Sequence, residues 1–410
     1  MDSPPHTNGH QPLHVLILSD RDWTHPQGGG TGTNLYGQVS RWIAWGHRVS
    51  VISCSYPGAA AVERHGPLTL HRVGGRSTVF PRAILRQWRG LVPDADVVLE
   101  VVNGITFLTP LWLRAPRLTL VHHIHRDHYV REMGRLGRVA AFLLETLPLR
   151  LLYRRSRFLT ISRASADGIA AHGIPHERIE VGYIGVELGA FAPDPSARAE
   201  EPTLLYLGRL KRYKRLEVLL DVLEQNPDAV LEIAGDGDHR EALEAQIDER
   251  GLRPRVRLHG HVSEERKLEL YQRAWLNVTA SSAEGWCLSV MEAAACGTPS
   301  AALAVGGLGE SIDDGRTGAL AGDTAELARK VAAILHDGEL RDALGRAALE
   351  RASEFSWDAT AGNTLGLLRE ERMRWRERNG RVLPAAPTDP ARQPVGHDHD
   401  SEDQASLPRV

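Results

Sequence analysis

The stretch from Ser281 to Pro299 (SSAEGWCLSVMEAAACGTP) carries the residue types that most clearly suggest chemistry. An apolar run at Leu276–Thr279 predicts a strand before it, and the pattern predicts a helix that begins near Leu288. Ligands of open α/β sheets bind where strands end and helices begin, and the first amides of a helix attract anions. We therefore expect a diphosphate to accept hydrogen bonds from the backbone N–H groups of Cys287, Leu288 and Ser289.

Two glutamates in this stretch could bind hydroxyl groups. Glu284 lies in the loop before the predicted helix, and Glu292 lies about one turn inside it. The two carboxylates would meet opposite ends of one bound molecule and would not act as a pair on one face. Two glutamates at this separation mean little alone, so their weight comes from the sequence around them.

Basic residues follow another predicted strand, Thr203–Leu207. Arg209 and Lys214 stand just beyond its end, where fixed cations would stabilise the negative charge of a departing diphosphate. The other interpretation is a solvated basic loop, because three more basic residues surround them.

These residues need α/β sheets to position them. In the first half, His14–Ser19 and Arg48–Ser53 are apolar runs on either side of a glycine-rich loop and a helical stretch. A second alternation of short apolar runs and amphipathic helices begins at Thr203, and together the two series predict two doubly wound parallel sheets. The stretch 191–203, rich in proline, alanine and charge, is interpreted as a linker. The second series predicts helices near Leu216–Leu223 and Arg240–Ile247, strands at Ala229–Ile233 and Arg255–Leu258, and a last helix from Trp357 to about Arg378.

Two further clusters lie in the first half. The glycine-rich run Pro26–Thr33 does not fit a dinucleotide fingerprint, because its glycines do not follow the preceding strand directly. Histidines follow the apolar run Leu118–Val121, but their spacing does not direct three imidazoles at one metal ion. A structural interpretation is open for each cluster: a flexible turn for the glycine-rich run, and hydrogen bonding to loop backbone groups for the histidines. The structural interpretation is favoured for His125 and His128.

The motif E-G-aromatic-x-L-x-x-x-E-A-x-A-C-G-T-P resembles the signature of glycosyltransferase family 4, retaining enzymes of the GT-B fold. The resemblance runs from about His14 to about Leu368 and is most specific in the second half. It implies an α/β protein with two Rossmann-like domains that face a cleft and a C-terminal helix that crosses back to the first domain. The domains are expected at 12–195, completed by 356–378, and at 202–355, with disordered ends at 1–11 and 379–410.

The resemblance also implies a nucleotide diphosphate sugar, UDP- or GDP-linked, as donor and a role for each matching residue. Glu292 would bind the ribose hydroxyls and Glu284 the donor sugar, while Arg209 and Lys214 would hold the diphosphate. His122 would lie near the reacting carbon of the sugar. The predicted catalytic residues are thus His122, Arg209, Lys214 and Glu284. The predicted donor-binding residues add Gly29, Gly30, Gly235, Val262, Cys287, Leu288, Ser289 and Glu292.

Cys287 stands where the family usually has glycine. If its backbone N–H points at phosphates from a helix N-terminus, the helix dipole and nearby cations would lower the pKa of its thiol. The alternative is a buried, inert thiol. The two interpretations predict opposite reactivity for this side chain.

The resemblance implies a retaining transfer to an acceptor hydroxyl, with no metal and no other cofactor. Two alternatives are a nucleotide-sugar epimerase of GT-B shape, which should lack the glutamate motif, and a non-catalytic protein that binds sugar nucleotides. A dehydrogenase would need the dinucleotide fingerprint that is missing.

The composition agrees with a globular protein: 42% of the residues are hydrophobic and 25% are charged. The net charge of −3 gives no reason to expect a nucleic-acid partner. Only four of the 49 lysines and arginines are lysines. Three cysteines without a paired framework, and no export signal or spanning apolar run, lead us to expect a cytoplasmic protein.

The acceptor is not specified by these motifs. Between Arg126 and Arg157, arginines alternate with apolar residues, which predicts either contact with an anionic membrane surface or a packed helix pair with a solvated basic side. Small-molecule, saccharide and lipid-linked acceptors are all compatible with the sequence.

Overall fold

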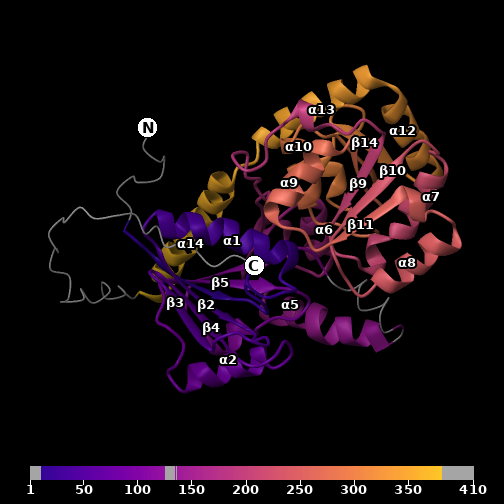
Figure 1. Ribbon diagram of the computed structural model, residues 1–410. Coiled ribbons are helices and arrows are strands. Elements are labelled where there is room, and N and C mark those ends of the chain that lie inside the picture. Colours follow the sequence, from indigo (N-terminus) through magenta and orange to yellow (C-terminus); the bar gives the residue numbers. More distant parts are fainter. Residues whose placement is uncertain (1–10, 125–133, 135, 381–410) are drawn as a thin grey trace. The chain divides into compact units, whose positions relative to one another are not determined.

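The computed structural model describes residues 11–124, 134 and 136–380. The chain divides into two compact units, shown with their sheets in Figure 1. Unit 1 comprises Met1–Leu159, His172–Arg178 and Ala361–Val410, and unit 2 comprises Thr160–Ala171 and Ile179–Thr360. Two sheets of mainly parallel strands with helices on their faces confirm the predicted α/β class.

The first sheet has eight strands in the order β3-β4-β2-β1-β5-β6-β7-β8. The strands β4, β2, β1, β5 and β6 pair in parallel, whereas β3 pairs antiparallel with β4, an edge hairpin that the sequence analysis did not predict. The bounds are β1 His14–Leu18, β2 Arg48–Ser53, β3 Val62–His65, β4 Leu68–Arg72, β5 Val97–Val102, β6 Arg117–Val121, β7 Arg157–Thr160 and β8 Ile179–Val181.

Helices cover both faces of this sheet, and its central strands β1 and β5 are therefore buried along their whole length. On one face, α1 (Gly29–Ala44) and α14 (Trp357–Asn379) pack apolar side chains against the strands, and the indole N–H of Trp42 donates to the backbone oxygen of Ala361 at 2.9 Å. On the other face lie α2 (Val79–Trp88), labelled in Figure 1, and α3 (Thr109–Trp112), whose Trp112 packs on the same core.

The second sheet has six strands in the order β11-β10-β9-β12-β13-β14, all paired in parallel. Four of its strands match predicted ones to within two residues, because short, buried apolar runs leave little choice of boundary; the two strands at 300–303 and 318–321 were not predicted. The bounds are β9 Thr203–Leu207, β10 Val230–Ala234, β11 Val256–Gly260, β12 Leu276–Thr279, β13 Ser300–Leu303 and β14 Gly318–Ala321.

Helices also cover both faces of the second sheet. The helices α7 (Leu216–Glu224), α8 (Arg240–Glu249) and α12 (Thr324–His336) share one hydrophobic core with the strands. A second core contains α9 (Glu264–Arg273), α10 (Leu288–Ala295) and α13 (Gly338–Ser353). Short segments complete the described elements: η1 Phe142–Thr146, α5 Leu147–Leu152, α6 Arg163–Ala171, η2 His176–Arg178, η3 Pro195–Ala197, η4 Arg212–Lys214, η5 Arg253–Arg255 and α11 Leu308–Ser311.

The two units divide at different residues from those predicted. Residues 12–195 were expected to lie in one domain, whereas 160–171 and 179–195 belong to unit 2. The physical reason is long-range packing: Tyr183 stacks on Trp286 with ring centroids 4.7 Å apart, and the backbone N–H of Val186 donates to Phe355 at 3.0 Å. The last helix starts in unit 2 and belongs to unit 1 from Ala361, in agreement with the predicted return.

The predicted linker 191–203 is not a free connector, so that interpretation was wrong. The Phe191 ring is buried and packs edge-on against Tyr271, with centroids 5.9 Å apart. Farther along, the indole N–H of Trp275 donates to the backbone oxygen of Ala199 at 2.7 Å. The proline-rich composition of 191–203 indicates irregular backbone, but contacts such as those of Phe191 and Ala199 pack that backbone against the rest of unit 2.

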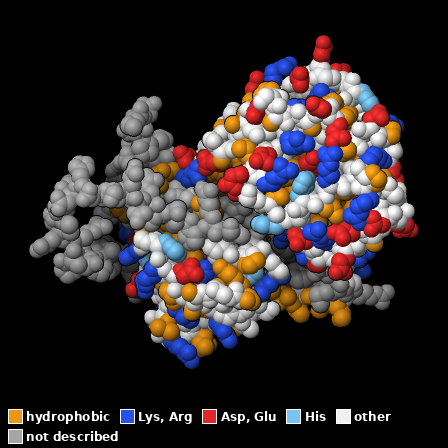
Figure 2. All heavy atoms as spheres, viewed as in Figure 1, with side chains coloured by type: hydrophobic (Ala, Val, Ile, Leu, Met, Phe, Trp, Pro, Cys, Tyr) orange, Lys and Arg blue, Asp and Glu red, His pale blue; other side chains and the backbone are white. Residues whose placement is uncertain are grey.

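Most of the predicted disordered ends, together with His125 and His128, lie outside the described residues; Asn379, assigned to the tail, ends α14. On the face of unit 2 seen in Figure 2, basic and acidic side chains are interspersed. No helix among the described residues is long and apolar enough to cross a membrane.

Two buried histidines of unit 1 predict how stability depends on pH. Burial, reinforced by nearby arginines, lowers the pKa of His14 and of His47 to about 4. An unfolded imidazole titrates near 6.5, so between these values the unfolded chain binds more protons and the free energy of unfolding falls as the pH drops. Each histidine contributes on the order of 3 kcal/mol to this loss.

We expect the urea midpoint to fall between about pH 7 and pH 5, and His47→Gln to reduce this dependence. The exposed His261→Gln is the matched control and should leave the slope unchanged. A variant at His47 with the full pH dependence of the parent would contradict the assignment.

Candidate ligand-binding site

The order of strands in the second sheet places a ligand site at one edge. The chain moves outward from β9 through β10 to β11 on one side, and then from β12 through β13 to β14 on the other. Ligands of such sheets bind beyond the carboxyl ends of the strands where the order reverses, here between β9 and β12. The segments that follow these two strands, Gly208–Lys214 and Ala280–Cys287, contain Arg209, Lys214 and Glu284.

Direct contacts join these two segments. The backbone N–H of Ser282 donates to the backbone oxygen of Tyr213 at 2.8 Å. The ammonium group of Lys214 forms a salt bridge with Oε1 of Glu284, which also accepts from the Ser281 hydroxyl at 2.7 Å. The structure therefore brings Lys214 and Glu284 together, although seventy residues of sequence separate them.

Lys214 is a fixed positive charge in this site. Burial alone would lower the pKa of its ammonium group, but the Glu284 carboxylate raises it above its ordinary value. Arg209 is exposed, and its guanidinium donates to the Tyr213 phenol at 3.4 Å. Lys214, fixed by its salt bridge, and the exposed Arg209 together provide positive charge beyond β9 that suits an anionic ligand.

The backbone around Glu284 is held by close approach of glycines. The backbone N–H of Gly307 donates to the backbone oxygen of Glu284 at 2.9 Å. A Cβ on Gly307 would lie 1.9 Å from the backbone oxygen of Gly285, and one on Gly306 would lie 2.2 Å from the backbone oxygen of Glu284. Residues larger than glycine therefore cannot be placed at these two positions. The neighbouring Trp286 is buried and donates to the Ile184 oxygen at 3.1 Å. The aromatic position of the motif thus anchors the loop that carries Glu284.

Cys287 is the N-cap of α10 and has a φ of +73°. This is the left-handed region, which favours glycine and costs other residues about 1–2 kcal/mol. The only other non-glycine residues with positive φ in the described part of the chain are Leu108 and Arg215, and Arg215 directly follows Lys214. Two of these three strained positions therefore lie beside the candidate site, as is common where a ligand binds.

Of the two interpretations of Cys287, the lowered thiol pKa was wrong and the buried thiol is favoured. Burial raises the pKa of this thiol to about 11, and the nearby Glu284 carboxylate adds to the effect. The Sγ atom lies 3.4 Å from the Ser289 hydroxyl, inside the first turn of α10. The charge of Lys214 and hydrogen bonds with Ser289 and the Val290 backbone act to lower the pKa of this thiol, but loss of solvation outweighs them. The backbone amides of Cys287, Leu288 and Ser289 stay predicted phosphate donors, because first-turn amides lack partners within the helix.

The positive φ gives a stability prediction. We expect Cys287→Gly to unfold at higher urea than Cys287→Ala, by about 1 kcal/mol, because only alanine retains the strain. Cys296 provides the matched control: it is the C-cap of the same helix with a φ of −87°, so Cys296→Gly should not exceed Cys296→Ala. Equal stability of the two variants at position 287 would show that the strain is absent.

Glu292 is held in place by two partners from α9. Its Oε1 lies 3.1 Å from the Lys267 ammonium group, and its Oε2 accepts from the Tyr271 hydroxyl at 2.8 Å. The carboxylate is almost fully buried, yet its remaining lone pairs can still accept from two hydroxyls of a ligand. Burial raises the pKa of Tyr271 well above its usual range, so it remains a donor.

Sequence reasoning missed Lys267 and Tyr271. Lys267 also approaches the Phe191 ring, with its nitrogen 5.0 Å from the centroid. A signal for Lys267 was present: lysine is rare in this arginine-rich chain, and two of the four lysines pair with the two motif glutamates.

Two more predicted donor-binding residues lie at the same edge. Gly235 follows β10, and a Cβ there would lie 2.0 Å from the Gly208 oxygen, so the backbones beyond β9 and β10 are in close contact. Val262 follows β11 and packs, half-buried, on the same core as Leu288.

The predicted residues of unit 1 lie at the carboxyl end of its sheet. The glycine-rich run is not one loop as predicted, because α1 begins at Gly29; Gly29 and Gly30 form its first turn, with Gly29 at a φ of +56°. His122 follows β6 and is buried. Its Nε2 accepts from the Asn34 amide at 2.9 Å, and Asn34 accepts from Gln38, also at 2.9 Å.

His122 is uncharged at neutral pH. Burial, with a smaller effect of His123, lowers the pKa of its imidazole to about 3. The Asn34 bond uses Nε2 as acceptor, which places the ring proton on Nδ1. A neutral imidazole can orient a polar group but cannot supply positive charge. Among the described residues, no three His, Cys, Asp or Glu side chains are arranged to hold a metal ion.

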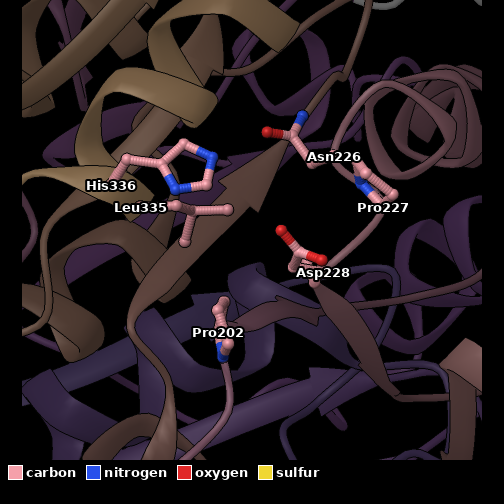
Figure 3. A pocket seen from close by; sticks show the side chains of 7 residues that line it. Pro202, Asn226, Pro227, Asp228, Leu335 and His336 are labelled. Atoms are coloured by element: carbon pink, nitrogen blue, oxygen red, sulfur yellow. The ribbon is translucent and has the colours of Figure 1, made fainter.

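A small pocket in unit 2 lies at the other end of the second sheet (Figure 3). Pro202 and Ala229 directly precede β9 and β10, and Leu335 and His336 end α12. The pocket therefore lies at the amino ends of the strands, away from the segments that carry Lys214 and Glu284, and parallel sheets do not place their ligands there.

Comparison with known proteins identifies the family of the chain. A model described as Glycosyltransferase Family 4 matches residues 28–189, and one described as Glycosyl transferases group 1 matches residues 191–351. The two matches cover consecutive parts of most of the chain, and the second contains both motif glutamates. The chain belongs to glycosyltransferase family 4.

Similar sequences support the same family. A D-inositol 3-phosphate glycosyltransferase from Nocardioides is 35% identical over 229 residues, which cover 49% of this glycosyltransferase and 50% of that protein. Another from Paenarthrobacter aurescens is 31% identical over 240 residues, covering 54% of this chain and 59% of that protein. The chain spans about half the length of the curated relatives it matches.

A sucrose-phosphate synthase from Thermosynechococcus elongatus superposes on 87% of this glycosyltransferase and 98% of its own length, with a TM-score of 0.76 and 24% identity. The fold is thus GT-B, as predicted. The epimerase alternative gains no support from these comparisons.

Proposed function

We propose that this glycosyltransferase moves a sugar from a nucleotide diphosphate sugar to the hydroxyl of a small-molecule, saccharide or lipid-linked acceptor. The observation that carries the proposal is the pair of lysine–glutamate contacts beside α10. Lys214 pairs with Glu284 before the helix, and Lys267 pairs with Glu292 inside it. The site thus combines cations for a diphosphate with oriented carboxylates for hydroxyl groups.

The residues divide the donor between them. Arg209, Lys214 and the first amides of α10 bind the diphosphate, Glu292 accepts from the ribose hydroxyls, and Glu284 accepts from the sugar. The C1–oxygen bond breaks and its electron pair leaves with the diphosphate. The acceptor oxygen then bonds to C1 from the same side, its proton passes to the departing phosphate oxygen, and the configuration is retained. Catalysis rests on fixed charges and position.

At the carboxyl end of unit 1, His122 and the first turn of α1 are proposed to position substrate. Because its imidazole is neutral, His122 acts as a hydrogen-bonding group. We place the reaction in the cytoplasm, because the three cysteines are all unpaired, which suits a reducing compartment.

Relatives guide the choice of donor for the first experiment. The Anabaena protein HepE, with a TM-score of 0.70 and 19% identity, was solved with UDP-glucose and covers 87% of this chain. We therefore test UDP-sugars first, beside GDP- and dTDP-sugars, by release of the nucleotide diphosphate with and without added acceptor hydroxyl compounds. Turnover of at least one donor is expected. Binding of sugar nucleotides without any turnover would favour the non-catalytic alternative.

We also propose that the reaction needs no divalent metal. The positive charge that such an ion could supply comes instead from Arg209, Lys214 and the α10 N-terminus. Turnover is expected to be unchanged in excess EDTA. Loss of turnover with chelator, restored by Mg²⁺ or Mn²⁺, would contradict this part of the proposal.

A further inference from the structure

The helical segment 136–152 of unit 1 points large apolar side chains at solvent. Six of its residues are each between 40% and 72% exposed, which is unusual for side chains of this size in one short segment. Hydrophobic side chains are visible near α5 at the lower edge of the face shown in Figure 2. The six are Leu136, Val139, Phe142, Leu143, Leu144 and Leu151.

Only one narrow face of the segment is buried against the protein. The buried positions recur every four residues, as one stripe of a helix does: Gly137, Ala141, Glu145 and Leu149. A surface helix of a globular protein ordinarily buries its large apolar side chains and exposes polar ones. This segment reverses the pattern, so its outer apolar side chains are not explained by the packing of unit 1.

Within positions 136–155 the exposed charged side chains are all arginines. Arg138, Arg154 and Arg155 are exposed and form no ion pair with any described residue. Glu145 is the one acid at positions 134 and 136–155, and it is fully buried. A solvated basic face would carry polar residues between its arginines, but here the arginines border apolar side chains.

We propose that the exposed apolar and arginine side chains of 136–155 form a surface that binds an anionic lipid bilayer. The apolar side chains would enter the boundary between headgroups and acyl chains, while the arginines contact anionic headgroups. Charge complementarity selects this occupant: a second copy of the chain would bring the same arginines against each other, and a neutral apolar partner would leave them unused. The proposal does not depend on the proposed sugar transfer.

The test is co-sedimentation of the full chain with vesicles. We expect binding to vesicles that contain phosphatidylglycerol, weaker binding to pure phosphatidylcholine, and loss of binding as salt is raised. The variant Leu136→Ser/Phe142→Ser/Leu143→Ser should lower partition to the anionic vesicles by at least about tenfold. The variant Arg138→Glu/Arg154→Glu/Arg155→Glu should do the same.

Control variants carry the same kinds of substitution, apolar to serine and arginine to glutamate, at exposed positions outside this segment. Met373→Ser, at a residue that is 55% exposed in α14, and Arg329→Glu/Arg346→Glu, on exposed positions of α12 and α13, should bind as the parent does. Circular dichroism and thermal melting confirm that each variant is folded. Absence of binding to any vesicle, equal loss in the controls, or binding that ignores lipid charge would overturn the proposal. A dimer in light scattering that the triple serine variant abolishes, without vesicle binding, would assign the surface to a second copy instead.

Discussion

Lys214→Met is expected to lower kcat of sugar transfer by about 10²–10³-fold, the usual cost of removing one preorganised group that stabilises charge in a transition state. The ammonium group is fixed beyond the end of β9 by its salt bridge with Glu284, and its pKa is raised there, so it is charged at any pH of interest. As the C1–oxygen bond breaks, negative charge grows on the diphosphate, and Lys214 counters it without rearrangement.

The neighbouring Lys211 provides the matched control. It pairs with Asp238 on the surface at 2.6 Å, where both side chains are substantially exposed. Lys211→Met should change kcat less than about twofold, since exposed ion pairs contribute little. The double variant Lys214→Met/Glu284→Gln avoids an unpaired carboxylate, and a melting curve like that of the parent shows that lost activity is not lost folding. Full kcat in a folded Lys214→Met variant would remove this residue from the mechanism.

The second large effect is expected at Glu292. Hydrogen bonds to a charged group are worth about 1.5–3 kcal/mol each, so loss of even one of them in Glu292→Ala should weaken binding of the free nucleotide diphosphate by roughly 10- to 150-fold. The partners on α9 strengthen this expectation, because Lys267 and Tyr271 hold the carboxylate in one orientation before any ligand binds. Such orientation lowers the entropic cost of binding.

Isothermal titration of the nucleotide measures this effect separately from chemistry. Glu264→Ala is the control, because Glu264 contacts the same Lys267 at 2.8 Å but is exposed and lies outside the predicted site. Glu292→Gln, which keeps one acceptor for the partners on α9, distinguishes loss of the ligand contact from disturbance of the helix pair. Unchanged affinity in a folded Glu292→Ala variant would refute the ribose assignment.

Local patterns predicted the elements well and the contacts poorly. Strands such as Arg48–Ser53 and Leu276–Thr279 were predicted with the bounds observed, because fully buried apolar runs between loop residues are read directly from sequence. The start of α10 at Leu288 was also predicted. These features depend on residues close together in the chain.

What the sequence could not provide depends on residues far apart. The contact of Glu292 with Lys267 spans twenty-five positions, and the burial of Phe191 against Tyr271 spans eighty. The thiol of Cys287 shows the same limit: its place at a helix N-terminus was predictable, but the desolvation that raises its pKa arises from packing.

A crystal structure of the chain with bound UDP-glucose tests the central claim most directly. We predict the diphosphate over the first turn of α10, within hydrogen-bonding distance of Arg209 and Lys214, and the ribose hydroxyls on Glu292. A diphosphate bound elsewhere in unit 2, such as at the amino ends of the strands beside Pro202, Asn226 and His336, would contradict it.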